Sequence, residues 1–269
     1  MLVSLLISTY NWKEALSLCL YSVFAQTVKP AEILIADDGS RDDTRQMIED
    51  MRKKTDIPIV HVWHEDKGFR LSAIRNRSIV MAKGDYIIQI DGDIILEEHF
   101  IADHLELAEK GFFVCGSRVL LGKKYSNRLL KGLETRPAKL KQDYRFMLNG
   151  FRSRILRHYL ANRYAKHNMF RIRGCNMAFW KEDLYRVNGY NESLEMWGQE
   201  DVEISYRLLH TGVQKKQLKM GGVQFHLYHK FASRANLDFH EKVLKEVIDS
   251  KQVWCENGIV KGKQKIGSE

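Results

Sequence analysis

The chain has 269 residues, of which 44% are hydrophobic and only three are proline, and its formal net charge is +9. This composition excludes a disordered tail and suits one large or two small domains. No apolar stretch reaches the ~20 residues that a bilayer-spanning helix needs. The four cysteines form no CxxC pair, so we expect reduced thiols of a cytosolic protein rather than a disulfide framework or a zinc site.

The first 91 residues alternate between strand and helix patterns. Strands are expected at 2–7, 32–36, 59–63 and 86–91, and helices at 14–24, 42–54 and 71–82. The start of the chain lacks the basic segment of a signal peptide, so we interpret it as the first strand. Ser40, with Asp43 three residues on, is typical of a cap for the second helix. The alternation predicts an α/β fold with a parallel sheet and right-handed crossovers.

Each expected strand is followed by a polar cluster. These clusters lie at 8–11, 37–38, 64–70 and 91–93. In an open parallel sheet, ligands bind outside the carboxyl ends of the strands. We therefore expect the four clusters to meet along one edge. No GxGxxG follows the first strand and no GxxxxGK[ST] is present, so dinucleotide or P-loop binding is not indicated.

Asp91-Gly92-Asp93 places two carboxylates at the end of a buried strand. An unpaired buried charge is costly, so this pair needs a partner. Hard oxygen ligands suit Mg²⁺ or Mn²⁺ and leave positions for water and phosphate oxygens. Gly92 would let a ligand approach closely. The alternative is a turn with solvated aspartates.

Other side chains in the clusters fit a nucleotide. Tyr10 offers a ring that can stack on a base, and an aspartate after the second strand can accept from a base or a ribose. Arg70 and Arg75 can each donate two hydrogen bonds to phosphate. The alternatives are a partly buried core ring for Tyr10 and a solvated helix face for Arg75.

Residues 118–173 form a basic insert, after an expected helix at 97–110 and an expected strand at 112–116. The insert has 16 Lys and Arg residues against two acidic residues, a net charge of +14. A helix expected at 146–165 would present Leu148, Phe151, Ile155 and Tyr159 on one face. A basic amphipathic helix with aromatic residues is typical of a membrane surface, where anionic lipid attracts each basic residue by roughly 1 kcal/mol. The alternatives are a helix packed on the core with a solvated charged face, or a site for an anionic acceptor or nucleic acid, although no nucleic-acid-binding motif is present.

A strand is expected at 172–179, where Gly174 suits close ligand approach. A helix then runs to residue 209 and opens with Glu200, Asp201 and Glu203. The helix dipole favours acids in a first turn, which is the structural alternative for them. Trp197, just before these acids, is more specific, because an indole covers the apolar face of a sugar while carboxylates bind its hydroxyls.

Two histidines follow, His226 and His229, and one of them could complete a metal shell with Asp91 and Asp93. The alternative is a structural role, which is the commoner one for a lone histidine. Residues 236–254 are expected to form a helix and residues 258–269 a frayed tail.

Three of these motifs resemble the nucleotide-binding half of family 2 glycosyltransferases with the GT-A fold. They are Ser8-Thr9-Tyr10-Asn11, Asp37-Asp38-Gly39-Ser40 and Asp91-Gly92-Asp93. Residues 68–76, 197–203 and 206–208 resemble the N-acetylgalactosaminyltransferase module of bacterial chondroitin polymerase and, more distantly, the β1,4-galactosyltransferases. The resemblance covers about residues 1–116 and 174–228, and leaves out the basic insert and the tail.

The resemblance implies an α/β fold of the GT-A, Rossmann-like type, with a mostly parallel sheet flanked by helices and a basic helical insertion. It implies a catalytic domain at 1–230, with a nucleotide-binding half (1–117), the basic insert (118–173) and an acceptor and catalytic half (174–230). A C-terminal helix and tail would occupy 231–269.

The resemblance also implies roles for single residues. The nucleotide would contact Ser8, Tyr10, Asp38, Arg70, Arg75 and Asp91, with Asp38 on uracil. Mn²⁺ or Mg²⁺ would bind Asp93, Asp91 and His226, with His229 as the competing ligand. Trp197, Glu200 and Asn176 would bind sugar, and Asp201 would be the catalytic base.

The predicted function is inverting, metal-dependent transfer of a hexose or N-acetylhexosamine, with GalNAc or Gal favoured, from a UDP-sugar. The acceptor would be a glycan or lipid-linked glycan in surface polysaccharide or lipopolysaccharide synthesis. We expect a cytoplasmic protein, peripheral on the inner face of the membrane through the basic insert, with no nucleic-acid partner.

Two alternatives remain. A sugar-nucleotide nucleotidyltransferase would need a basic Gly-rich loop where residues 8–11 stand. A non-catalytic membrane- or polyanion-binding protein would have no use for the two intact acidic pairs, Asp91 with Asp93 and Glu200 with Asp201.

Overall fold

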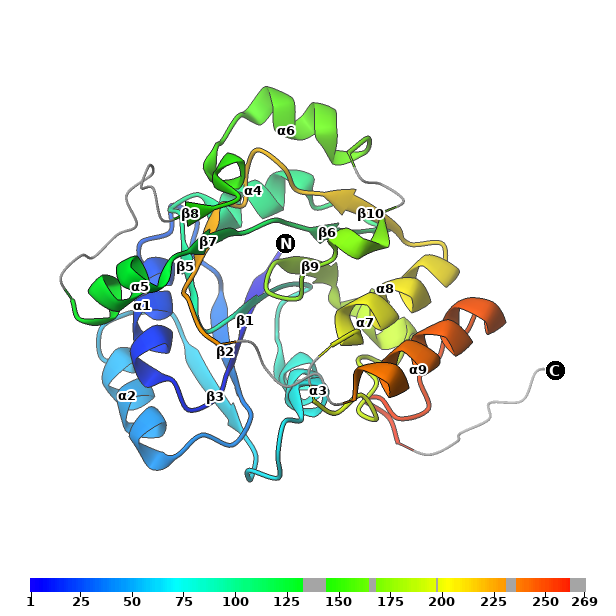
Figure 1. Ribbon diagram of the computed structural model, residues 1–269, viewed down its shortest axis with the longest axis horizontal. Coiled ribbons are helices and arrows are strands. Elements are labelled where there is room, and N and C mark those ends of the chain that lie inside the picture. Colours follow the sequence, from blue (N-terminus) through cyan, green and yellow to red (C-terminus); the bar gives the residue numbers. More distant parts are fainter. Residues whose placement is uncertain (133–143, 165–167, 197, 231–235, 262–269) are drawn as a thin grey trace.

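The computed structural model describes residues 1–132, 144–164, 168–196, 198–230 and 236–261. Within these residues, a seven-stranded sheet of order β10-β6-β9-β4-β1-β2-β3 forms the centre of the molecule (Figure 1). Its strands are β1 (Val3–Thr9), β2 (Glu32–Asp37), β3 (Ile59–Trp63), β4 (Tyr86–Asp91), β6 (Phe112–Cys115), β9 (Met177–Trp180) and β10 (Gln214–Gln217). The strands β1 to β4 run parallel as predicted, whereas β9 is antiparallel to β4 and β6.

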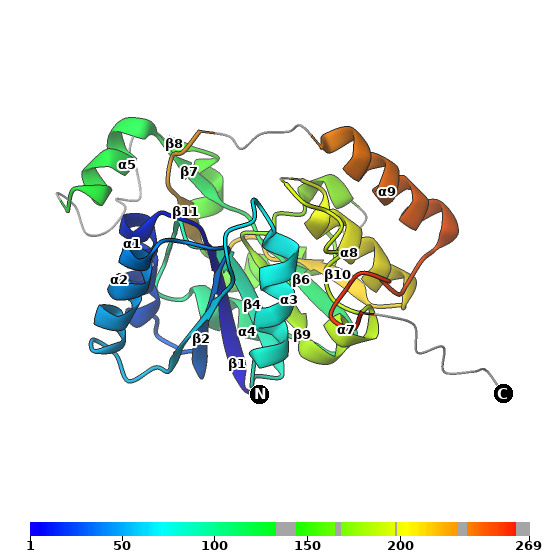
Figure 2. The ribbon, with the colours of Figure 1, turned by 90° about the horizontal axis from the view of Figure 1, so that it is seen from below.

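Helices cover both faces of this sheet. The helices of the described residues are α1 (Lys13–Phe24), α2 (Asp42–Arg52), α3 (Leu71–Met81), α4 (Phe100–Leu107), α5 (Lys123–Leu130), α6 (Arg154–Ala161), α7 (Lys181–Arg186), α8 (Glu200–His210) and α9 (Leu237–Ser250). Figure 2 shows α1 and α2 on one side of the sheet and α3 and α8 on the other. Each face of the sheet has its own hydrophobic core. Leu5 of β1 packs in the core on one face and Leu6 in the core on the other, because successive strand residues point to opposite faces.

A second sheet, absent from the sequence prediction, lies beside the carboxyl end of β4. Its order is β5-β11-β7-β8, with β5 (Ile94–Leu96), β11 (Gln224–His226), β7 (Val119–Leu121) and β8 (Tyr144–Arg145). Strand β5 follows Asp93 directly, and β11 pairs with it so that His226 stands opposite Ile94. The basic insert supplies β7, which pairs with β11, and β8, which pairs with β7.

Several local predictions were wrong. Ser40 does not cap α2, because its hydroxyl accepts from the backbone N–H of Asn11 and α2 has no side-chain cap. The helix expected at 97–110 spans only α4. The strand expected at 172–179 begins at Met177, after a 3₁₀ turn at Met169–Arg171.

The helix expected at 146–165 is divided. A 3₁₀ turn, Met147–Gly150, is followed by α6, which begins after Ser153 and ends at Ala161. Helix α9 ends at Ser250, where Lys251 adopts φ +53°, so it is shorter than expected. Most of the predicted tail, residues 262–269, lies outside the described residues. In the part of the chain that the structure describes, we find no helix with the length and apolarity to cross a bilayer.

Candidate active site at the carboxyl edge of the sheet

The polar clusters after the strands do share one edge. Ser8 stands between Ala36 and Asp91 in the parallel register of β2, β1 and β4. The backbone of Asp38 donates to Thr9 O (3.0 Å), and that of Gly92 donates to Ser8 O (2.7 Å). A Cβ at Gly92 would lie 3.1 Å from Ser8 O, so the close approach that we predicted for Gly92 is to β1. The prediction of a common edge is confirmed.

Asp93, His226 and His229 form a candidate metal site. The Nε2 atoms of His226 and His229 lie 3.6 Å and 3.3 Å from Asp93 Oδ2. Each histidine donates from Nδ1 to a backbone carbonyl, at 2.8 Å and 2.7 Å, so a neutral ring directs the lone pair of Nε2 at the carboxylate. The two Nε2 lone pairs and the Asp93 carboxylate oxygen are all hydrogen-bond acceptors, so a cation or a proton must lie between them. Asp93 Oδ1 is also buried with no hydrogen-bond partner, so these residues fit a divalent ion.

This geometry bears on two sequence predictions. It brings both histidines to Asp93, where the sequence favoured His226 and kept His229 as the competing choice. Asp91 is not in this group, because its Oδ1 faces Arg75 Nη2 at 3.4 Å. The signal for His229 was its three-residue spacing from His226.

Arg75, from α3, is buried at 1% exposure among carboxylates. Its Nη1 lies 3.0 Å from Asp201 Oδ1 and 3.6 Å from Glu200 Oε1, and its Nε donates to Ser8 Oγ at 3.2 Å. The prediction that Arg75 holds phosphate is therefore contradicted, and so is the solvated-face alternative. Its donors face side chains of the protein, because α3 packs on β1, β2 and β3 and places Arg75 between Asp91 and Asp201.

The guanidinium of Arg75 faces the carboxyl groups of Asp91, Glu200 and Asp201 at different distances, so these groups differ in how readily they hold a proton. Burial, and then the nearby Asp201, raise the pKa of Glu200 to about 8. Burial also raises the pKa of Asp201, although Arg75 acts against that shift. Because Arg75 is closer to Asp201 than to Glu200, we assign the negative charge to Asp201 and the proton to Glu200 near neutral pH.

Asp201 is held on several sides. Its Oδ1 accepts from Arg75 and from the Tyr190 hydroxyl (3.4 Å), and Tyr190 also donates to Gln89 Oε1 (2.9 Å). Gln89 Nε2 donates to Gly174 O at 2.9 Å. A Cβ built on Gly174 would overlap the Asp201 carboxylate, so the close approach predicted for Gly174 is to this side chain. No local sequence pattern pointed to Gln89 or Tyr190.

The predicted nucleobase residues lie together near the ends of β1 and β2. Asp38 Oδ1 contacts His64 Nε2 (2.6 Å), and its Oδ2 accepts from the Arg70 backbone (2.8 Å). Burial raises the pKa of Asp38. Tyr10 is half exposed, and its hydroxyl donates to Asp66, so the buried-ring alternative is wrong. The contact of Asp38 with uracil stays a prediction.

Trp197 and Asn176 were also predicted to bind sugar. Trp197 lies outside the described residues. Asn176 is fully buried, with Nδ2 donating to Ser117 O (2.8 Å) and Oδ1 next to His104 Nε2 (2.8 Å). Its amide is used within the protein, so the predicted contact of Asn176 with sugar is contradicted and its role is to fix neighbouring backbone.

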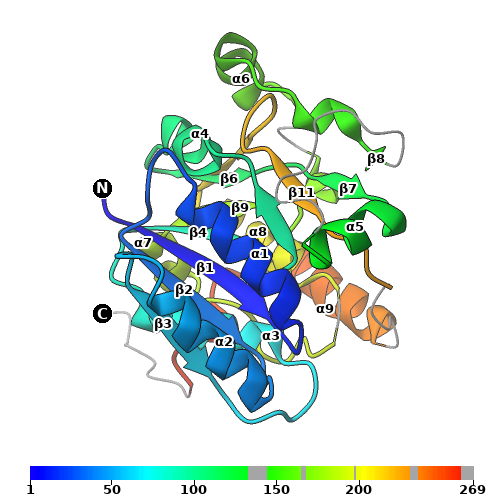
Figure 3. The same ribbon diagram turned by 90° about the vertical axis from the view of Figure 1, so that its left-hand side faces the viewer.

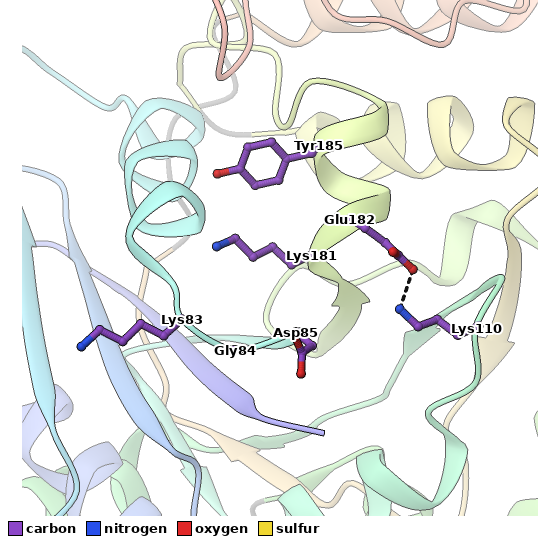
Figure 4. A pocket seen from close by; sticks show the side chains of 7 residues that line it. All are labelled: Lys83, Gly84, Asp85, Lys110, Lys181, Glu182 and Tyr185. Carbon is purple, nitrogen blue, oxygen red and sulfur yellow. Dashed lines mark hydrogen bonds and ion pairs between the residues drawn. The ribbon is translucent and has the colours of Figure 1, made fainter.

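A cavity of about 330 Å³ lies elsewhere, at the amino end of β4. Asp85, Lys181 and Tyr185 are among its lining residues, and Lys110 pairs with Glu182 at its side (Figure 4). It is at the opposite end of β4 from Asp91 and Asp93. We therefore place the candidate active site at the carboxyl edge and not in this cavity.

Comparison with known proteins decides the family. The family described as Glycosyl transferase family 2 matches residues 4–187, more than half of the chain. The chain belongs to this family. A second description, N-terminal domain of galactosyltransferase, matches residues 154–230, which include Asp201, His226 and His229. The predicted family is confirmed, and the chain is a family 2 glycosyltransferase.

Chondroitin synthases are among its relatives. The chain is 27% identical over 238 residues to that of Pasteurella multocida, covering 83% of this chain and 24% of that protein. It is 25% identical over 242 residues to that of Escherichia coli, covering 83% of this chain and 34% of that protein. The chain thus spans about a quarter to a third of the length of these relatives.

Solved structures show the fold. A mannosyltransferase from Pyrobaculum calidifontis, in complex with GDP-Man and Mn²⁺, has a TM-score of 0.60 at 18% identity, covering 85% of this chain and 57% of that one. S. aureus TarS 1-349, in complex with UDP, has a TM-score of 0.62 at 15% identity, covering 91% and 64%. The predicted GT-A fold is confirmed.

Gly174→Ala tests whether Gly174 packs directly against the Asp201 carboxylate. The added methyl overlaps the Asp201 carboxylate, so we expect glycosyl transfer to fall at least about tenfold while nucleotide binding stays intact. Gly150→Ala is the control, since Gly150, like Gly174, has no positive φ, and a Cβ there would meet only a side-chain atom of Val119 at 3.6 Å, an ordinary contact. Equal activity of the two variants would contradict the close approach.

Glu200→Gln tests the proton on Glu200 through stability. The pKa of Glu200 is about 8 in the fold against an ordinary 4.5, so the folded state holds an extra proton between these values. Stability therefore falls as pH rises from about 4.5 to about 8, by up to ~1.4 kcal/mol per pH unit, and is flat above.

We expect thermal unfolding of the Gln variant, followed in EDTA from pH 6 to 8.5, to lose less stability than the parent protein. Glu195→Gln, at an exposed position, should behave like the parent. Parallel pH curves for parent and Glu200→Gln would place the proton elsewhere.

Proposed function

We propose that this family 2 glycosyltransferase is inverting and metal-dependent, and moves a hexose or N-acetylhexosamine from a UDP-sugar. One observation carries this proposal: the Asp93–His226–His229 group and the Asp201 carboxylate lie at one sheet edge, joined through Asp91 and Arg75. Transfer needs a metal ion that binds the donor diphosphate and a base that takes the proton of the acceptor hydroxyl, and the two must lie close together. GalNAc or Gal is favoured by the resemblance of residues 68–76, 197–203 and 206–208 to an N-acetylgalactosaminyltransferase.

Asp201 is the proposed base. Its ionised carboxylate takes the proton of an acceptor hydroxyl while that oxygen bonds to the anomeric carbon, and the bond from that carbon to the diphosphate breaks on the opposite face. Because one displacement inverts the configuration, an α-linked donor gives a β-glycoside. Arg75 and Tyr190 hold Asp201 in place, and the neutral Glu200 can donate to a sugar hydroxyl.

Asp93, His226 and His229 would hold Mn²⁺ or Mg²⁺. When bound, such an ion neutralises charge on the diphosphate leaving group. The mannosyltransferase with Mn²⁺ supports a divalent ion, and the complexes with GDP-Man and with UDP support a sugar-nucleotide donor. Asp38, beside the half-exposed Tyr10, would accept from uracil.

The proposed acceptor is a glycan or lipid-linked glycan of surface polysaccharide or lipopolysaccharide. The chondroitin and hyaluronan synthases among the relatives support polysaccharide synthesis. The nucleotidyltransferase alternative lacks its Gly-rich loop. No specific observation favours the non-catalytic alternative, since Asp201 is held in position by Arg75 and Tyr190.

Asp201→Asn tests the base. We expect transfer to fall about 10²–10⁴-fold, since the amide cannot accept the proton, while UDP binding is kept. Turnover of a UDP-sugar panel and thermal shift with UDP measure the two effects. Asp238→Asn, in the first turn of α9, is the control for a first-turn acid and should retain transfer. Near-normal transfer by Asp201→Asn would remove Asp201 from the base role.

Thermal shift with UDP, GDP, CDP and ADP, each with Mn²⁺ or EDTA, tests the donor and the ion. Only UDP with Mn²⁺ should stabilise, by roughly 2.7 kcal/mol at 100 times its dissociation constant. His229→Ala should weaken this effect, and His210→Ala, on α8 away from Asp93, should not. Stabilisation by UDP that ignores EDTA would contradict the metal role, and a preference for another base would contradict the role of Asp38.

A further inference from the structure

Five large apolar side chains between residues 146 and 159 are exposed by half or more. They are Phe146, Leu148, Phe151, Ile155 and Tyr159, and Ile155 reaches 83%. We call them the apolar surface. Figures 1 and 3 place α6, which carries two of them, at the periphery of the molecule. A cluster of exposed apolar residues of this kind marks an interaction site.

Helix α6 is attached to α4 by ion pairs and to the core by Ala161, whereas Ile155 and Tyr159 point outward. Arg157 is 1% exposed, and its guanidinium lies 2.9 Å from Asp103 and 2.6 Å from Glu106 of α4. Arg152 also pairs with Asp103, at 2.7 Å. An amphipathic helix ordinarily packs its apolar side on the core. The alternative of a helix that packs its apolar face on the core and exposes its charged face is therefore wrong for Ile155, Tyr159 and Arg157.

Basic residues surround the apolar surface. Arg145, Arg154 and Arg163 are exposed, and the guanidinium of Arg163 lies 4.7 Å from the ring centroid of Tyr159. The insert as a whole has a net charge of +14. Aromatic and aliphatic groups flanked by arginine match the boundary of a lipid layer, where acyl chains meet anionic headgroups.

We propose that the apolar surface docks this protein on an anionic membrane. Charge decides the occupant, since a second copy would bring the same basic residues face to face. The segment also hydrogen-bonds the backbone just before β11, because Ser153 N and Arg157 Nη1 donate to Met220 O. Docking would hold the strand that carries His226 close to the bilayer. If the proposed function holds, this placement serves a lipid-linked acceptor.

Sedimentation with vesicles tests the docking. The protein should bind vesicles that contain phosphatidylglycerol, bind pure phosphatidylcholine at least tenfold more weakly, and lose affinity as salt rises. Ile155→Ser with Tyr159→Ser should lower binding at least tenfold. Arg154→Gln should lower it about fivefold. Val80→Ser with Met81→Ser, two half-exposed positions on α3, is the matched control and should bind as the parent does.

Unchanged thermal unfolding and UDP binding of the variants would show that they are folded. The proposal is overturned if the parent ignores anionic vesicles, or if the Ile155 and Tyr159 variant binds like the control. Light scattering measures the oligomeric state in parallel. If the parent protein is a dimer that does not bind vesicles, and the Ile155 and Tyr159 variant is a monomer, the apolar surface binds a second copy of the chain and the proposal is overturned. None of these outcomes depends on nucleotide binding, so a failure of the docking proposal would leave the proposed glycosyl transfer unaffected.

Discussion

The guanidinium of Arg75 is the interaction on which the site depends. It is buried beneath the carboxyl edge and faces Asp91, Glu200 and Asp201. Three carboxylates in a space with little water would repel one another, and removing a buried partner of this kind costs about 3–5 kcal/mol. Arg75 therefore makes it possible for acids from β4 and α8 to stand together. It also determines which of them keeps its charge.

Two separate regions of the chain meet through this cation. Asp91 belongs to the parallel half of the sheet, and Asp201 opens a helix that follows the antiparallel strand β9. The second sheet adds the other side of the site, because β11 pairs with β5 and carries His226 to Asp93. The proposed base and the candidate metal group thus lie on different elements, and Arg75 pairs with Asp201 on one side and with Asp91, two residues before Asp93, on the other.

Sequence reasoning located the parallel core because its signals are local. Each of β1 to β4 is an apolar run of five to seven residues with a polar end, and the fold places those ends together. The second sheet had no such signal, since β5, β7 and β11 are three residues long and β8 is two. Short strands are specified by their partners, which lie far away in the chain.

The errors at single residues share this cause. Arg75 has the chemistry to bind phosphate, and only the tertiary contacts with Asp91 and Asp201 reveal that carboxylates take its donors. Asn176 lies in an expected strand, where nothing local shows that its amide fits between Ser117, His104 and Gly222. In α6 the apolar periodicity was visible, but the direction in which it points follows from the buried partners of Arg157.

The pairing of β11 with β5 has a consequence for assembly. His226 and Asp93 are about 130 residues apart in the chain, and closing a loop of that length costs conformational entropy before any contact rewards it. The unfolded chain therefore cannot preform the ligand set. A divalent ion that fits these side chains would bind the folded state selectively, so its binding would stabilise the pairing of β11 with β5.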